Sequence, residues 1–317
     1  MADPLPTNQP HAYVYGLAVA PGFGTSGVCF AAHQAGLSRS EDGGATWRDA
    51  LEALGLDAPL STTSVALSPG FPRDGTVLAG APGGILRSDD GGRTWSAITL
   101  PSPPPFISAL ALSPCFERDG AALAATMEDG VFVTGDGGRR WEAWNIGLLD
   151  HAVLCLAVSP AFERDRTVLA GSESGLFVST NGGRFWRETA FPPEAAPVLS
   201  LALSPAFERD GVAFAGTAAH GLFASHDGGQ SWQPHALEGA VNALLLAPEY
   251  PARPYLLALL DDAPLVSRDG GRSWSPCLAS EPGAVSALAA PLGLDPGRPL
   301  LLGLATGGVR RAAIGDG

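Results

Sequence analysis

The strongest constraint on this chain is an octet that recurs six times at nearly even spacing. The octet reads Ser-x-Asp-x-Gly-x-x-Trp, with threonine first in the third copy and asparagine in place of aspartate in the fourth. Successive tryptophans lie 48, 46, 45, 46 and 42 residues apart. Its key members are Asp42, Trp47, Asp90, Trp95, Asp136, Trp141, Asn181, Trp186, Asp227, Trp232, Asp269 and Trp274. A fixed period of this length indicates a repeat architecture.

A second marker runs in phase with the first. An apolar stretch ending in proline recurs seven times, at Pro21, Pro69, Pro114, Pro160, Pro205, Pro248 and Pro291. Each unit reads as four short strands, which we call A to D, in about 45 residues, the size of a propeller blade. The sequence therefore predicts an all-β fold: one seven-bladed β-propeller domain over residues 1–317, with four-stranded antiparallel blades. The blades are expected to start near residues 13, 61, 106, 152, 197, 240 and 284.

The seventh unit is incomplete. Strands are expected at 285–290, 299–304 and 308–312, and no octet follows them. An unclosed ring would leave an exposed sheet edge. We therefore expect part of the segment before Tyr13 to supply the outer strand of blade seven.

The octet resembles the BNR, or Asp-box, repeat of sialidase-like propellers and of propellers that act as photosystem assembly factors. The resemblance covers nearly the whole chain. In such a box, a carboxylate such as Asp42 can accept hydrogen bonds from backbone N–H groups two or three residues on. The glycine pair supplies positive φ, and the tryptophan buries its ring between neighbouring blades. Because these residues recur in every box, we expect them to serve the blades structurally.

Blade connectivity sorts the remaining residues onto two faces. The A–B connections and the C–D turns share one face, here called the bottom face, and the other connections share the top face. Four Phe-x-Arg-Asp turns fall on the bottom face and predict a solvated ring of Arg–Asp ion pairs: Arg73–Asp74, Arg118–Asp119, Arg164–Asp165 and Arg209–Asp210.

The top face is where the blades differ from one another. Loops on a rigid scaffold are where binding residues concentrate. Ser61, Thr62 and Thr63 lie in one of these connections. The binding candidates on this face are His33, Glu128, Asp129, His151, Glu173, His220, Asn242, Asp261 and Asp262.

Catalysis by familiar routes finds little support in the residues. The Phe-Arg-Ile-Pro segment of sialidases is absent, the expected inner strands carry no charge, and no G-x-S-x-G motif occurs. The chain has no lysine, which excludes a Schiff-base mechanism. A hydrolase of neutral glycans needs only two suitably spaced carboxylates. Asp129 or Glu173, together with Asp261 or Asp262, could supply them.

The composition of the chain argues against several classes of binding partner. The net charge of −13 argues against nucleic acid or an anionic membrane surface as partner. No apolar run is long enough to span a membrane, and residues 1–10 lack the features of a signal peptide. A cytoplasmic location is expected, with export that does not use a cleaved signal left open. The four cysteines are widely spaced, so we expect free thiols and neither a metal site nor a cofactor.

The uncharged inner strands and the missing catalytic sets favour a non-enzymatic protein-interaction or scaffold propeller, with another protein as partner. The alternative is a glycan-binding protein or glycoside hydrolase that acts on neutral glycans through the top-face carboxylates.

Overall fold

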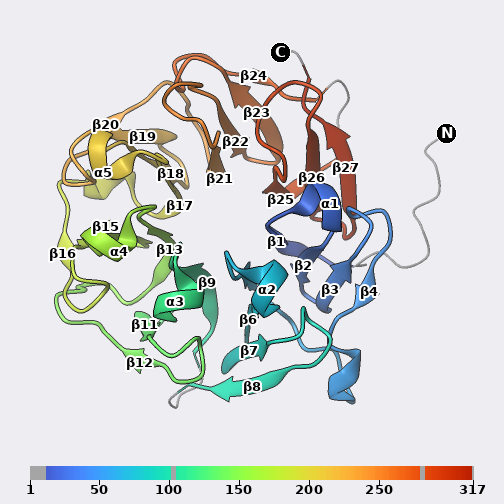
Figure 1. Ribbon diagram of the computed structural model, residues 1–317. Helices are drawn as coiled ribbons and strands as arrows, with labels where there is room; N and C mark the ends of the chain where they lie inside the picture. The colour runs from blue at the N-terminus through green and yellow to red at the C-terminus, as the bar shows by residue number, and fades with distance from the viewer. Residues whose placement is uncertain (1–11, 101–104, 279–282, 316–317) are drawn as a thin grey trace.

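Seven small antiparallel sheets surround a central axis (Figure 1). The computed structural model describes residues 12–100, 105–278 and 283–315. The predicted seven-bladed β-propeller is confirmed, and each sheet is one blade with its strands in chain order from the axis outward.

The first three blades comprise strands β1 to β12. Blade one holds β1 (Val14–Val19), β2 (Cys29–His33), β3 (Gly36–Ser40) and β4 (Arg48–Asp49). Blade two holds β5 (Ser64–Leu67), β6 (Val77–Ala81), β7 (Gly84–Ser88) and β8 (Ser96–Thr99). Blade three holds β9 (Ile107–Leu112), β10 (Ala122–Thr126), β11 (Val131–Thr134) and β12 (Glu142–Ala143).

The next three blades repeat this plan. Blade four holds β13 (Val153–Val158), β14 (Val168–Ser172), β15 (Leu176–Ser179) and β16 (Arg187–Glu188). Blade five holds β17 (Val198–Leu203), β18 (Ala213–Thr217), β19 (Leu222–Ser225) and β20 (Gln233–Pro234). Blade six holds β21 (Val241–Leu246), β22 (Leu256–Leu260), β23 (Ala263–Ser267) and β24 (Ser275–Pro276).

Blade seven has three strands within the described residues: β25 (Val285–Ala289), β26 (Pro299–Leu304) and β27 (Val309–Ala313). The fourth strand expected from the segment before Tyr13 falls on residues 1–11, outside the described part of the chain, so this closure stays a prediction. The inner strands do close the ring. The Ser286 hydroxyl donates a hydrogen bond to the Val14 carbonyl at 2.8 Å, and Trp47 of blade one packs with Leu301 of blade seven in one buried cluster.

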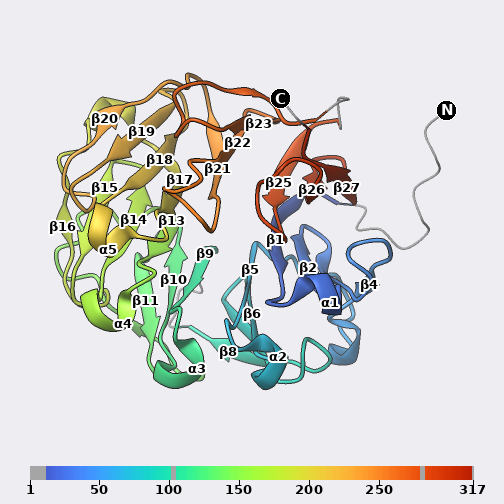
Figure 2. The same ribbon diagram turned by 45° about the horizontal axis from the view of Figure 1, so that its top comes forward.

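Short helices link the first and second strands of the first five blades. They are α1 (Phe23–Ser26), α2 (Phe71–Asp74), α3 (Phe116–Asp119), α4 (Phe162–Asp165) and α5 (Phe207–Asp210). All five lie on the bottom face (Figures 1 and 2). Two 3₁₀ turns, η1 (Glu52–Leu54) and η2 (Pro193–Ala195), precede the inner strands of blades two and five. No helix in the described ranges is long and apolar enough to cross a membrane.

The core lies between blades. Phe30 of blade one clusters with Phe71 and Trp95 of blade two, and Leu78 of blade two clusters with Phe116 and Trp141 of blade three. Burial of such large rings supplies most of the driving force for packing the blades together. All six box tryptophans are buried or nearly so, as expected for rings packed between neighbouring blades.

Side-chain hydrogen bonds fasten the inner strands to one another at five of the seven blade seams within the described residues. Each donor is a small residue near the start of one inner strand, and each acceptor is a carbonyl of the following blade. Besides the bond from Ser286 to Val14, four others follow this pattern: Thr63 donates to the Ile107 carbonyl, Ser108 to the Val153 carbonyl, Cys155 to the Val198 carbonyl and Ser200 to the Val241 carbonyl. The uncharged inner strands foreseen from the sequence therefore hold the ring together.

Candidate functional site

The predicted top-face residues lie at the ends of inner and middle strands or in the turns that follow them. Glu128 and Asp129 follow β10, and Glu173 follows β14. His220 follows β18, Asn242 lies in β21, and His151 precedes β13. Asp261 and Asp262 form the turn between β22 and β23, where Asp261 has a positive φ of 53°.

His33 differs from the other top-face candidates because it is buried. Its side chain is 6% exposed at the end of β2, and its Nε2 lies 2.9 Å from the Ser38 hydroxyl. Burial lowers the pKa of His33 to about 4, and the nearby Asp49 carboxylate opposes this only partly. The imidazole is therefore neutral at physiological pH and is enclosed within blade one.

The other candidates are held mainly by backbone contacts. The Asp129 N–H donates to the Thr126 hydroxyl at 2.9 Å, and the Asn242 amide donates to the Asp261 carbonyl at 2.7 Å. Within the described residues, no hydrogen bond or ion pair joins the side chains of any two of the nine. Across the same ranges, no cluster of three or more histidine, cysteine, aspartate or glutamate side chains is arranged to hold a metal.

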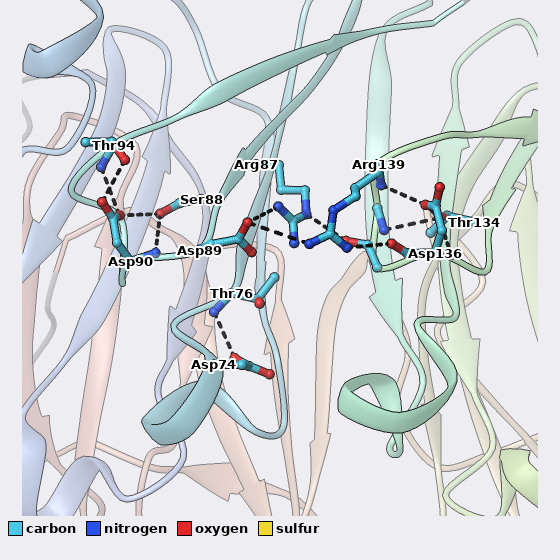
Figure 3. Close-up of polar contacts among 12 residues, drawn as sticks. Asp74, Thr76, Arg87, Ser88, Asp89, Asp90, Thr94, Thr134, Asp136 and Arg139 are labelled. Atoms are coloured by element: carbon cyan, nitrogen blue, oxygen red, sulfur yellow. Dashed lines mark hydrogen bonds and ion pairs between the residues drawn. The ribbon is translucent and has the colours of Figure 1, made fainter.

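In the five boxes on the bottom face that keep the aspartate, its Oδ1 accepts the same pair of backbone hydrogen bonds, as Figure 3 illustrates for blades two and three. In the fourth box, Asn181 accepts only one such backbone bond, from the Phe185 N–H at 2.9 Å. Asp90 Oδ1 accepts hydrogen bonds from the N–H groups of Arg93 and Thr94, both at 2.9 Å, and Oδ2 accepts one from the Thr94 hydroxyl at 2.6 Å. The sequence reasoning placed the donors two or three residues on; they lie three and four residues on. The glycine pair turns the backbone back toward the carboxylate, with φ of 77° at Gly91 and 83° at Gly92.

These hydrogen bonds shift the pKa of the box carboxylates. Partial burial raises the pKa of Asp42, but the Thr46 hydroxyl and N–H and the Ser40 hydroxyl outweigh it and bring the value to about 2. The box aspartates are thus ionised and hydrogen-bonded within their own turns, which fits a structural role.

Three of the four arginines in the predicted ring form ion pairs, but with different partners, and no ion pair of Arg209 occurs among the described residues. Arg118 pairs with Glu163 at 2.8 Å, and Arg73 and Arg164 reach Glu117 and Glu208 in the same way, each from one blade to the next. The prediction that each arginine pairs with its adjacent aspartate was wrong. The aspartate instead caps its own turn: Asp119 accepts from the Ser113 hydroxyl and from the Ala121 N–H.

Neighbouring boxes also enclose a groove at each of several blade seams. In the seam between blades one and two, Glu41 pairs with Arg39 at 2.7 Å and approaches Arg93 at 3.8 Å. The seam between blades two and three repeats this arrangement. Asp89 pairs with Arg87 and approaches Arg139 at 4.0 Å (Figure 3). A carboxylate of one blade thus lies between two guanidinium groups.

The seam between blades three and four departs from this plan. Val133 replaces the first arginine and Gly135 replaces the carboxylate. The resulting groove has a volume of about 830 Å³, against about 500 Å³ in the preceding seam. It is lined by Arg140, Arg166 and Arg184, and by Trp144, Asn181 and Phe162 among others. The Arg184 guanidinium lies over the Trp144 ring, 5.1 Å from its centroid.

Residues 25–147 match the model of the family described as photosynthesis system II assembly factor YCF48. Together with the six boxes, this match decides the type of repeat. The chain is a BNR-repeat β-propeller. No curated protein sequence matches it.

Solved structures similar to this BNR-repeat propeller share its fold at low sequence identity. The extracellular domain of BT4673 from B. thetaiotaomicron is 14% identical, with a TM-score of 0.71, and the match covers 95% of this chain and 38% of that one. An ancestral GH74 enzyme is 18% identical, with a TM-score of 0.71 and coverage of 94% and 44%. YCF48 bound to D1 peptide is 18% identical, with a TM-score of 0.69 and coverage of 98% and 95%. This propeller therefore spans less than half of the first two chains and nearly all of the third.

Sequence reasoning missed the arginine-lined groove of this BNR-repeat propeller. Two signals pointed to it. Trp144 is the one tryptophan outside the octets. Arg166, with φ of 51°, occupies a helix-end position that is glycine in the equivalent turns of its neighbours, Gly120 and Gly211. Both signals are departures from the repeat, and only the fold shows that they face the same groove.

Proposed function

We propose that this propeller is a non-enzymatic, protein-binding scaffold that takes part in the assembly of a larger complex. The observation that carries the proposal is the match of residues 25–147 to a family described as an assembly factor. The structure of YCF48 bound to D1 peptide supports it, because that chain is similar in length and is matched almost from end to end.

The surface is compatible with this role. Arginine and tryptophan are enriched in protein interfaces, and the groove between blades three and four presents three arginines and Trp144. The ring itself is fastened at its inner strands and between its blades. A rigid scaffold of this kind loses little conformational freedom when a partner binds.

Affinity purification from the native host, followed by mass spectrometry, tests the proposal. We expect a defined protein to co-purify in stoichiometric amount at physiological salt, and to bind again when both proteins are purified separately. Recovery of the propeller alone, under both low and physiological salt, would contradict a scaffold role. Fractionation of the same cells tests the expected cytoplasmic location.

The likeness to GH74 structures favours the second candidate, a hydrolase or binder of neutral glycans. In that case Asp129 or Glu173 would act with Asp261 or Asp262. A glycan array and a hydrolysis assay should then show activity that Glu173→Gln or Asp261→Asn removes. Inactivity of the wild-type chain on neutral polysaccharides would dispose of this candidate.

A further inference from the structure

The groove between blades three and four lacks a carboxylate that the two preceding seams contain. Glu41 and Asp89 occupy the second position of their boxes, and each lies between an arginine of its own blade and one of the next. The equivalent residue in blade three is Gly135. A side chain placed there would enter open space, because a Cβ at Gly135 meets no atom within 4 Å.

The arginine that would face this carboxylate is still present. Arg184 is the fourth-blade equivalent of Arg93 and Arg139. Without an acidic residue opposite, its guanidinium lies over the Trp144 ring instead. We propose that this groove binds an acidic peptide segment of a partner protein, and that a carboxylate of the segment takes the place that Glu41 and Asp89 fill in the other seams. The inference rests on the proposed function and names the chemistry of the partner.

Two further cations converge on the same groove. Arg140 and Arg166 line it, and both residues are exposed. Over the described ranges, neither they nor Arg184 form an ion pair. Guanidinium groups are suited to carboxylates because their N–H donors match both oxygens.

Three carboxylates also line this groove, but each is already engaged. Asp119 accepts from Ser113 and Ala121, and Asp136 accepts from the N–H groups of Arg139 and Arg140 and from the Thr134 hydroxyl. Glu142 accepts from the Trp144 indole N–H at 3.3 Å. The acids are therefore held by neutral donors, and the guanidinium groups remain available to an incoming anion.

An apolar rim beside the groove favours a peptide over a small anion. Ile146 is 70% exposed, Leu149 is 76% exposed and Phe185 is 46% exposed. Ile146 and Phe185 lie near one another, because the Trp186 N–H donates to the Ile146 carbonyl at 2.8 Å and a Cβ at Gly147 would lie 3.2 Å from the Phe185 ring. Exposed apolar side chains gathered in one place are typical of interaction sites. We therefore expect a segment with a large apolar residue next to its acidic one.

A peptide-display selection on the folded chain tests this inference. Random heptapeptides are selected on the wild-type protein, and the enriched sequences are made synthetically and measured by fluorescence anisotropy. We expect peptides that pair aspartate or glutamate with a large apolar residue, and binding that weakens as salt rises because the contacts are ionic. Replacing the peptide acids with their amides should weaken binding at least about tenfold, a loss typical of a charge-assisted hydrogen-bonded contact.

The decisive variant is Gly135→Asp, which restores the internal carboxylate. It should abolish peptide binding while the chain stays folded, because the site is open and φ at Gly135 is not positive. Arg184→Ala should also weaken binding. His226→Asp is the matched control, since it adds the same charge at the equivalent box position two seams away.

The outcomes separate the inference from the proposed function. Enrichment of peptides without acids, no enrichment at all, or equal binding by the wild type and Gly135→Asp would overturn the inference. If a native partner is recovered and binds both Gly135→Asp and Arg184→Ala normally, the scaffold role stands and the groove is not its site. If no native partner is recovered, the proposed function itself fails, whatever peptides are selected.

Discussion

The seam between blades two and three and the seam between blades three and four are built from the same repeat but differ in how their charges are used. In the first, Asp89 lies between Arg87 and Arg139, and the groove is internally neutralised (Figure 3). In the second, Gly135 leaves Arg184 without that carboxylate, and the groove is larger.

The turns of the two seams differ as well. Blade three has Gly120 at the end of its helix and Asp136 in its box, whereas blade four has Arg166 and Asn181. A repeat that only has to fold gains nothing from a strained non-glycine residue or from a weaker box. The concentration of these departures at one seam fits the binding role that we propose for its groove.

The largest expected effect concerns the box tryptophans of the two seams. Trp186→Ala should lower the free energy of unfolding by about 3–5 kcal/mol, because a fully buried ring is lost. Trp141→Ala should lower the free energy of unfolding by somewhat less. The reason is that the Trp186 indole donates a hydrogen bond across the seam to the Trp144 carbonyl, whereas the Trp141 indole donates within its own box. Urea denaturation of both variants measures the difference. A smaller loss for Trp186→Ala would show that the fourth box matters less to stability than its burial indicates.

The second effect concerns the helix ends. Arg166→Gly should stabilise the protein by about 1 kcal/mol, because a non-glycine residue pays that much for a left-handed conformation. Gly120→Arg should destabilise it by more, since a Cβ there would lie 2.7 Å from the Gly137 nitrogen. Thermal unfolding of the two variants measures the direction of each stability change. A destabilised Arg166→Gly variant would mean that the stacking of Arg166 on Phe162 outweighs the backbone strain.

The smallest effect concerns the boxes and depends on pH. Burial raises the pKa of Asp136, but hydrogen bonds from the Arg140 N–H, the Thr134 hydroxyl and the Arg139 N–H outweigh it and lower the pKa below its usual value. Such a carboxylate stabilises the fold above the unfolded pKa, and this contribution is lost as pH falls through the folded pKa. Asn181→Asp should therefore add about 1 kcal/mol at pH 7, limited by solvent exposure, and Asp136→Asn should remove a similar amount.

Denaturation of these two box variants at pH 7 and pH 3 provides the measurement. The stability gained by Asn181→Asp should be smaller at pH 3 than at pH 7. The stability lost by Asp136→Asn should likewise be smaller at pH 3. A gain from Asn181→Asp that is the same at both pH values would contradict the assignment of the effect to the carboxylate.

Much of the fold followed from the sequence, because repetition multiplies a weak local signal. The box and the proline marker, each found in six or seven copies, predicted the blade number, the strand order within a blade and the burial of tryptophans such as Trp47. The partners of the ion-pair ring could not be predicted in this way. Arg118 has an aspartate next to it in sequence, yet pairs with Glu163 of the following blade, because Asp119 is occupied in capping its own turn.

The candidate site, too, could not be predicted where it depends on contacts between blades. Sequence reasoning looked for function where the blades differ and chose the top-face loops, which remain a prediction. It did not consider differences within the repeated turns, because each departure there is a single residue. Gly135, Arg166 and Arg184 are about 50 residues apart at most and carry no common motif.

The sequence by itself determined the architecture of this protein, since every blade contains its own turn chemistry and its own apolar strands. Only the tertiary structure decided which charges meet, because each seam is made by two blades that contribute different residues to one groove. Each repeat contains the residues that fold its own blade. The groove between blades three and four is larger and lacks the carboxylate of the preceding seams because neighbouring repeats are not identical. That difference affects which charges meet only after the blades are packed side by side.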